Sequence, residues 1–181
     1  MLTCFPGQLL QEMTRMLTYK IKGPWPGELA IIPRPRGGDW LDDEIYRLRD
    51  EGFDVVVSLL TAEETEELGL IGERESIERH GLQFFNYPIA DLGVPSSTKS
   101  ARELLTRLHR NLEDGKRVAL HCRGSIGRSG LIAAGILVLA GVEPSRAIRD
   151  VTNARGLESP ETSEQREWVK TLAAELAGLA A

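Results

Sequence analysis

The pattern of apolar and polar positions predicts strands that alternate with helices along the chain. Short apolar runs of strand length occur at 29–32, 53–60, 82–89 and 116–122. Segments with helical spacing or helix-start signals occur at 39–51, at 61–80 with a break near Gly69 and Gly72, and at 97–113, 131–140, 144–154 and 161–176. Three consecutive valines at 55–57 are typical of a strand buried on both faces, as in parallel sheets. The alternation predicts a single α/β domain whose mainly parallel central sheet has helices on both faces.

One predicted helix has a clear start and a clear buried side. Asp39 stands where the N-cap of the 39–51 helix is expected, and Gly52 follows its end. The apolar residues that share one face of this helix are Leu41, Ile45 and Leu48. We therefore expect this face to pack on the sheet.

Bulk composition narrows the classes of function. The chain has 181 residues, of which 41% are hydrophobic and 27% charged, an ordinary profile for a soluble domain. The net charge of −5 argues against a nucleic-acid partner, which usually requires a basic excess. The longest apolar run, at 131–142, is shorter than the roughly 20 residues of a membrane helix, so no membrane association is expected. No long heptad pattern is present, and we expect a monomer.

The chemistry is concentrated in the segment 121–129, which reads His-Cys-Arg-Gly-Ser-Ile-Gly-Arg-Ser. It lies between a predicted strand and a predicted apolar helix. A strand, a glycine-containing loop and a helix N-terminus together present a row of backbone N–H groups to an anion. A helix N-terminus and a nearby guanidinium both favour the thiolate form of cysteine. Cys122 is therefore the candidate nucleophile of an oxyanion cradle.

The other residues of the segment have separate expected roles. Arg128 has a planar guanidinium that can hold two oxygens of a phosphoryl group. The expected phosphate-binding loop consists of Arg123, Gly124, Ser125, Ile126 and Gly127. In this loop Gly124 and Gly127 allow unusual backbone angles and close approach. Ser129 is expected to donate its hydroxyl to the Cys122 sulfur, and His121 to orient the loop through a ring hydrogen bond.

Cleavage of a phosphate ester by a thiolate also needs a general acid for the leaving alcohol. Asp91 follows the strand predicted at 82–89 and precedes Gly93 and Pro95, so it lies in a loop. An aspartate in such a loop is often only a turn former. Beside an oxyanion cradle, the role of general acid is favoured.

The segment matches the H-C-x-x-G-x-x-R-[S/T] signature at every fixed position and resembles the cysteine-dependent protein tyrosine phosphatases. The order of residues 88–95 resembles the acid loop of the dual-specificity group, and roughly 29–172 resembles the kinase-associated phosphatase branch. The resemblance implies a phosphatase domain at 21–181, after an N-terminal extension at 1–20. It implies that Cys122 attacks phosphorus and forms a phosphocysteine. Asp91 would first protonate the leaving oxygen and then activate water.

The same resemblance implies a phosphorylated protein or another phosphomonoester as substrate, and neither metal nor cofactor. No Asn-Arg-Tyr segment typical of strictly tyrosine-specific enzymes occurs in the first half of the chain. Phosphoserine and phosphothreonine are therefore candidate substrates beside phosphotyrosine. A thiolate nucleophile requires a reducing compartment, and no secretory signal is evident, so a cytoplasmic location is expected.

Four further residues have two interpretations each. Glu64 either braces the cradle arginine, as the resemblance implies, or only completes a capping box with Thr61. Gln165 either positions the hydrolytic water, as in relatives, or is an exposed helical glutamine. Arg34 and Arg36 either contact substrate or form an ordinary solvated basic loop.

Two rival functions use the same cradle. An arsenate reductase or a sulfurtransferase would use Cys122 in redox chemistry, but arsenate reduction commonly needs resolving cysteines, and the one other cysteine is Cys4. A non-catalytic phosphoprotein-binding module usually lacks the nucleophile or the acid. Here Cys122, Arg128 and Asp91 are all present, which favours an enzyme.

Overall fold

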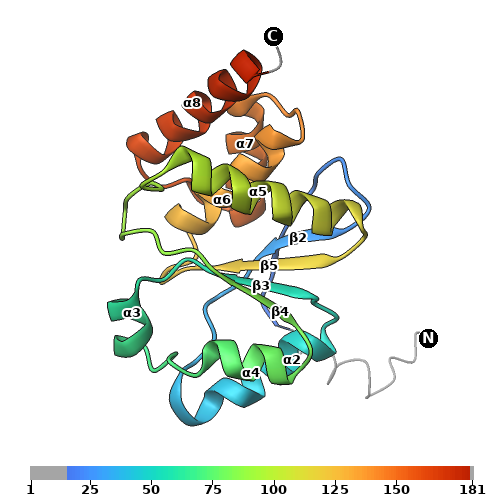
Figure 1. Cartoon of the computed structure of the whole chain (residues 1–181), viewed down its shortest axis with the longest axis vertical. Coiled ribbons are helices and arrows are strands. Elements are labelled where there is room, and N and C mark those ends of the chain that lie inside the picture. The colour runs from blue at the N-terminus through green and yellow to red at the C-terminus, as the bar shows by residue number, and fades with distance from the viewer. Residues whose placement is uncertain (1–15, 180–181) are drawn as a thin grey trace, which may run out of the picture.

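The computed structural model describes residues 16–179, and within them lies one five-stranded sheet (Figure 1). The strand order is β1-β2-β5-β3-β4. The strands are β1 Tyr19–Ile21, β2 Glu28–Ile31, β3 Val55–Ser58, β4 Gln83–Asn86 and β5 Arg117–His121. All neighbouring pairs are parallel except β1 and β2, which are antiparallel. The predicted α/β fold with a mainly parallel sheet is confirmed.

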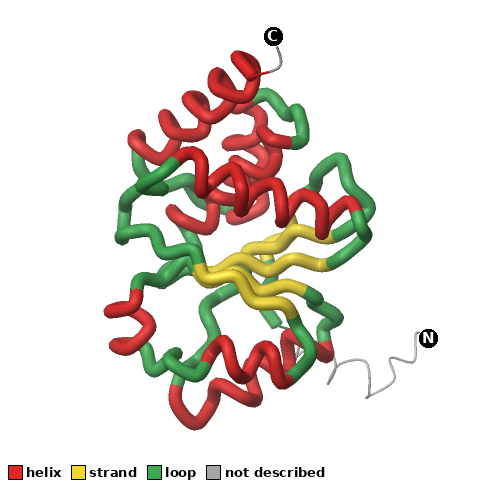
Figure 2. Tube along the Cα trace, in the orientation of Figure 1, coloured by secondary structure: helices red, strands yellow, loops and turns green. Residues whose placement is uncertain are grey.

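Helices cover both faces of this sheet, as the sequence predicted. They are η1 Gly38–Trp40, α2 Leu41–Asp50, α3 Ala62–Glu67, α4 Glu73–Arg79, α5 Thr98–Glu113, α6 Gly127–Leu139, α7 Pro144–Arg155 and α8 Ser163–Leu179. Figure 2 shows α5 to α8 gathered on one side of the strands, with α2 to α4 on the other. Within residues 16–179, no helix is both long enough and apolar enough to span a membrane.

The side-chain alternation of the central strands divides the core into two clusters. Val57 of β3 and Leu120 of β5 belong to the cluster beneath α5 to α8, whereas Val56 and Ala119 belong to the cluster beneath α2 and α4. All four side chains are fully buried, because parallel neighbours and helix layers enclose both faces. The same alternation continues past the end of β5 and places Cys122 in the first cluster.

The first strand was not predicted from the sequence. Tyr19 and Lys20, which the sequence analysis assigned to an extension, pair with Ile31 and Ala30 of β2. A strand of three residues is too short to show a clear alternation, which is why the pattern missed it. The remainder of the predicted extension, at 1–15, contains Cys4 and lies outside the described residues.

Asp39 is not the N-cap that the sequence predicted. It lies inside the short 3-10 helix η1, and α2 begins after Trp40 with no side-chain cap. The 3-10 turn leads directly into α2. The chain is therefore already helical at Asp39, which cannot act as the N-cap. The predicted buried face is confirmed: it consists of Leu41, Ile45 and Leu48.

Candidate active site

Cys122 lies immediately after β5, at the edge of the sheet where the parallel strands end. The loop at 123–126 then leads directly into α6, which begins at Gly127, four residues before the predicted apolar helix. The Cys122 side chain is 2% exposed and lines a pocket of about 230 Å³. The pocket is lined by Asp91, Leu92, Cys122, Arg123, Gly124, Ile126, Gly127, Arg128, Glu161 and Gln165. The fold thus brings the candidate nucleophile, acid and arginine into one pocket.

The loop backbone differs from the prediction at one glycine. Ser125, not Gly124, has a positive φ, of 53°. Within the described part of the chain, a Cβ on Gly124 would meet only Ile126 Cδ1, at 3.9 Å, so this packing does not require a glycine there. At Gly127, however, a Cβ would lie 2.9 Å from Gln165 Oε1. The close approach expected of a loop glycine therefore occurs at Gly127, where it admits the side chain of Gln165.

Arg128 lies in the first turn of α6 and is only 2% exposed. Its Nη1 donates to Glu64 Oε2 at 2.6 Å and to the Ile89 carbonyl at 2.9 Å, while Nη2 donates to Glu64 Oε1 at 2.8 Å. This bidentate pair fixes the plane of the guanidinium. The hydrogen bonds from Arg128 hold the pKa of Glu64 below its ordinary value.

Glu64 makes the contacts of both interpretations that the sequence left open. Its Oε2 accepts a hydrogen bond from the Thr61 backbone N–H at 3.1 Å, and its own N–H donates to Thr61 Oγ1 at 3.3 Å. This is the predicted capping box at the start of α3. The same carboxylate binds Arg128, so one residue joins the start of α3 to the cradle.

Asp91 faces the cradle from the loop after β4. Its Oδ1 lies 3.0 Å from Arg128 Nη2, and its side chain is 64% exposed. Leu92, next in the chain, has a φ of 59°, and the Gly93 N–H closes the turn by donating to the Ala90 carbonyl at 2.9 Å. The loop therefore holds a solvent-accessible carboxylate beside the guanidinium.

Gln165 is fully buried, so its interpretation as an exposed glutamine is wrong. Its Oε1 accepts from the backbone N–H groups of Glu161 and Thr162 at 3.1 and 3.3 Å. Its Nε2 donates to the Gly93 carbonyl at 3.0 Å. The side chain thus ties the start of α8 to the loop that carries Asp91.

The hydrogen bonds expected of His121 and Ser129 are not formed. His121 Nε2 lies 2.8 Å from Glu73 Oε1 of α4, without the alignment of a hydrogen bond, and both side chains are buried. Because side chains alternate along β5, His121 points to the opposite face of the sheet from Cys122. Ser129 Oγ is buried and has no hydrogen-bond partner among residues 16–179, so it makes no bond to the Cys122 sulfur.

Arg34 and Arg36 do not line the pocket around Cys122. Arg36 donates from Nε and Nη2 to Glu44 Oε1, at 3.1 and 2.7 Å. Its guanidinium also stacks on Trp40, 4.5 Å from the ring centroid. The predicted substrate contact has no support from this placement.

Glu67 is a charged residue near the site that the sequence analysis did not single out. Its carboxylate accepts from Nη1 and Nη2 of Arg123, at 2.8 and 2.7 Å. Glu67 follows Glu64 by three positions on α3, so both project toward the cradle. This i, i+3 spacing was the available signal, although an acidic helix offers several such pairs.

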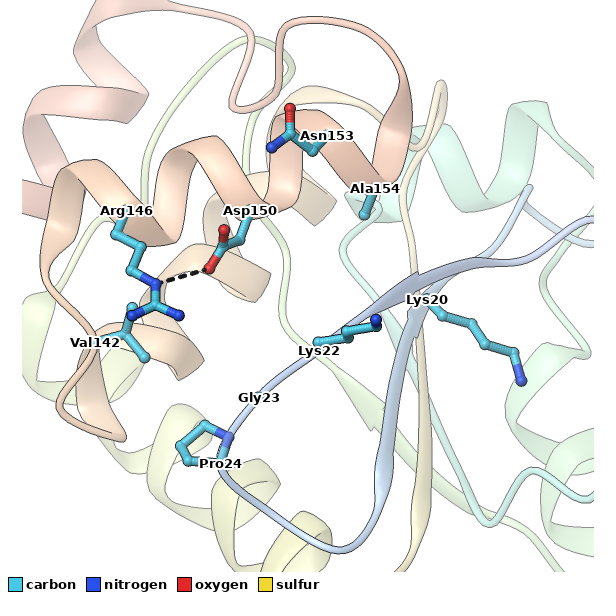
Figure 3. A pocket seen from close by; sticks show the side chains of 9 residues that line it. All are labelled: Lys20, Lys22, Gly23, Pro24, Val142, Arg146, Asp150, Asn153 and Ala154. Carbon is cyan, nitrogen blue, oxygen red and sulfur yellow. Dashed lines mark ion pairs between the residues drawn. The ribbon is translucent and has the colours of Figure 1, made fainter.

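A second hollow lies between β1 with its following loop and α7 (Figure 3). Figure 3 shows Arg146 directed toward Asp150, 3.6 Å away, while Lys20 turns outward, where it pairs with Glu28. Among the residues that the structure describes, neither a cysteine nor a histidine lines this hollow.

A family model described as "Polymorphic toxin system, DSP-PTPase phosphatase" matches residues 32–142, a stretch that includes Asp91, Cys122 and Arg128. The chain belongs to the DSP-PTPase phosphatase family. The predicted resemblance to dual-specificity phosphatases is thereby confirmed.

Proteins from a virus and from mammals are similar to this DSP-PTPase chain. It is 27% identical over 164 residues to "Putative tyrosine phosphatase 197R" of Invertebrate iridescent virus 6, covering 88% of the chain and 58% of the relative. It is 26% identical over 131 residues to cyclin-dependent kinase inhibitor 3 of Rattus norvegicus, covering 71% and 61%. The chain thus spans about three fifths of these two relatives.

Solved structures show the same fold. The kinase associated phosphatase, in a form whose catalytic-site cysteine is replaced by serine, superposes with a TM-score of 0.83 at 21% identity, over 91% of this chain and 97% of that one. Tk-PTP in its active form gives a TM-score of 0.69 at 28% identity, over 82% and 92%. The predicted alternatives of arsenate reduction and sulfur transfer gain no support from these matches.

Proposed function

We propose that this DSP-PTPase chain hydrolyses phosphomonoesters on phosphorylated proteins through a phosphocysteine at Cys122. The observation that carries the proposal is the pocket that contains Cys122, Asp91 and Arg128, with the loop 123–126 entering the N-terminus of α6. Backbone N–H groups at such a terminus bind anions, and a fixed guanidinium matches phosphoryl oxygens.

The proposed reaction has two steps. First, the Cys122 sulfur bonds to phosphorus, the ester oxygen leaves, and Asp91 transfers a proton to it. Second, Asp91 takes a proton from water, whose oxygen bonds to phosphorus and releases the Cys122 thiolate and phosphate. Arg128 and the loop N–H groups hold the non-bridging oxygens in both steps. The chemistry balances without an oxidant, a reductant or a metal.

The proposed substrates are phosphotyrosine proteins and, as a second class, phosphoserine and phosphothreonine proteins. Cys122 requires a reducing environment to stay a thiol, and we infer a cytoplasmic site of action on that ground. Two relatives have names that refer to kinases. Partner surfaces lie outside the cradle, so a kinase partner is not transferred to this chain.

The test is hydrolysis of p-nitrophenyl phosphate by the wild type and by Cys122→Ser, in dithiothreitol and EDTA. We expect turnover by the wild type and none by Cys122→Ser, while vanadate, a mimic of five-coordinate phosphorus, inhibits the wild type. Trapping of ³²P on the wild-type protein during turnover identifies the phosphocysteine.

Three results would overturn the proposal. Equal turnover by the wild type and Cys122→Ser would exclude a cysteine nucleophile. Absence of turnover in both, with thiol oxidation on addition of arsenate, would favour the redox alternative. Binding of phosphopeptides without any turnover would favour a phosphoprotein-binding module.

A further inference from the structure

We propose that Glu67 determines substrate specificity by competing with an acidic residue of the substrate for Arg123. The inference rests on the proposed function, and it names a preferred substrate: a phosphopeptide with a carboxylate next to the phosphorylated residue. In this arrangement Glu67 occupies Arg123 until the carboxylate of the substrate replaces it.

The cradle has two arginines, and α3 supplies a bidentate glutamate to each. Glu64 binds Arg128 and Glu67 binds Arg123, with all four N···O distances between 2.6 and 2.8 Å. The two pairs have similar geometry, so a difference in function between them must come from their surroundings.

Their surroundings differ strongly in exposure. The side chains of Arg128 and Glu64 are 2% and 12% exposed, and Arg128 is also bound to the Ile89 carbonyl. The side chains of Arg123 and Glu67 are 42% and 61% exposed. Exposed ion pairs contribute little free energy, whereas separating a buried pair is costly. The Arg128 pair is therefore fixed, and the Arg123 pair can exchange its carboxylate.

Arg123 lies so close to the cradle that a carboxylate replacing Glu67 must come from the substrate. It follows Cys122 in the chain and lines the same pocket. A group that reaches its guanidinium while phosphate lies on the cradle must be close to that phosphate. A carboxylate fits, because it can reproduce the bidentate contact that Glu67 makes.

Charge near the pocket explains why Glu67 matters. Asp91 and Glu161 also line the pocket, so the cations of Arg123 and Arg128 face several carboxylates. Because an acidic substrate must displace Glu67 from Arg123, it gains only part of the free energy of this contact. Removal of the Glu67 charge leaves Arg123 available. The resulting rise in kcat/KM should be confined to substrates that carry the extra anionic group.

The experiment compares two phosphotyrosine peptides that differ only in having Glu or Gln beside the phosphotyrosine. The ratio of kcat/KM for the acidic peptide to that for the neutral peptide is measured for the wild type, Glu67→Gln and Glu66→Gln. Glu66 is an exposed neighbour on α3 and makes no ion pair among the described residues, so its substitution removes the same charge without releasing Arg123. Arg123→Gln serves as the reverse variant.

We expect Glu67→Gln to raise the ratio roughly three- to five-fold, the range of an exposed ion pair, and Glu66→Gln to leave it unchanged. Arg123→Gln should bring the ratio close to one, and 0.5 M salt should reduce the gain of Glu67→Gln. An unchanged ratio in Glu67→Gln, or an equal rise in Glu66→Gln, would overturn the inference.

Binding separates this inference from the proposed function. The affinities of the two peptides are measured for Cys122→Ser with and without Glu67→Gln, which requires no turnover. If the wild type fails to hydrolyse p-nitrophenyl phosphate but Glu67→Gln still raises the affinity ratio, the proposed reaction is wrong and the role of Glu67 stands. If hydrolysis occurs and neither ratio changes, the role of Glu67 is wrong.

Discussion

Arg128 Nη2 lies 3.0 Å from Asp91 Oδ1, so the candidate phosphate ligand and the candidate general acid form an ion pair. The same Nη2 donates to Glu64 Oε1 at 2.8 Å. Arg128 Nη2 thus faces two carboxylates, that of Asp91 from the loop after β4 and that of Glu64 from α3. A phosphoryl oxygen that binds Nη2 must compete with Asp91, whose side chain is the more exposed of the two acids.

This relationship predicts opposite effects of Asp91→Asn on catalysis and on anion binding. Loss of the general acid should slow hydrolysis of an alkyl phosphate about 100-fold or more, and that of p-nitrophenyl phosphate much less, because its leaving group needs little protonation. Loss of the competing charge should tighten inhibition by inorganic phosphate. Steady-state rates and phosphate inhibition constants check both effects.

The matched control is Asp43→Asn, which removes the same charge from an exposed position on α2 outside the pocket. It should leave the leaving-group dependence unchanged. Equal slowing of both substrates by Asp91→Asn would show that Asp91 is not the acid. Weaker phosphate inhibition would show that the ion pair does not compete with the ligand.

Glu64→Gln should destabilise the fold and also impair the site. It leaves the buried Arg128 charge without its bidentate partner, a change that typically costs about 3–5 kcal/mol. Chemical denaturation of the wild type, Glu64→Gln and Glu66→Gln measures the difference. Glu66→Gln, on the same helix, should change the free energy of unfolding by less than about 0.5 kcal/mol.

The pH dependence of stability provides an independent check on Glu64. Its pKa is lowered in the folded state by the hydrogen bonds from Arg128, so the unfolded chain binds the proton more readily. The pair therefore stabilises the fold above the ordinary carboxyl value of 4.5 and loses this effect as the pH falls below it. The stability difference between the wild type and Glu64→Gln should shrink between pH 6 and pH 3. A constant difference would contradict the assignment.

Gly130→Ala should disturb the cradle through the loop that follows α7. A Cβ on Gly130 would lie 1.9 Å from Ser159 Oγ, and that hydroxyl donates to the Ile126 carbonyl of the loop at 2.7 Å. Overpacking of this kind typically costs about 1–3 kcal/mol. The temperature of thermal unfolding and kcat/KM should both fall.

Gly178→Ala is the control for this glycine. It lies in α8, and an added Cβ there meets no atom of the described residues within 4 Å. Because alanine is a better helix former, the substitution should leave stability unchanged or raise it by up to about 1 kcal/mol. A similar loss in both variants would mean that the contact with Ser159 is not the cause.

The fold and the centre of the site could be predicted because their signals are local. Consecutive valines identified β3, and the spacing from Cys122 to Arg128 lies within one strand-loop-helix unit. The carboxyl ends of parallel strands meet at one edge, which brings Asp91 of another loop to the same pocket.

The incorrect predictions concern features that depend on tertiary structure. The ring of His121 was expected to orient the loop through a hydrogen bond, but strand alternation directs it to Glu73 on the other face. Ser125 rather than Gly124 adopts the positive φ, and the residue types alone do not determine which of the two does so. The partner of Arg123 is distant in sequence, and nothing local distinguishes Glu67 from the other acids of α3.

The two proposed uses of Gln165 make different kinetic predictions. If Gln165 mainly tethers the Asp91 loop, as its bond to the Gly93 carbonyl suggests, Gln165→Ala should slow phosphoenzyme formation, most of all with poor leaving groups. If it mainly positions the hydrolytic water, the same substitution should slow hydrolysis of the phosphoenzyme. Rapid-quench measurement with p-nitrophenyl phosphate and an alkyl phosphate separates the two steps.

We expect the tether to dominate, because both ends of the Gln165 amide are already bound by backbone groups. Gln165→Ala should then form the phosphoenzyme more slowly from the alkyl phosphate, with a leaving-group dependence that approaches that of Asp91→Asn. In the double variant the two losses should not add, since both act through Asp91. Accumulation of phosphocysteine from both substrates, with an unchanged rate of its formation, would instead assign Gln165 to the water step. The bond to Gly93 would then have to open during turnover.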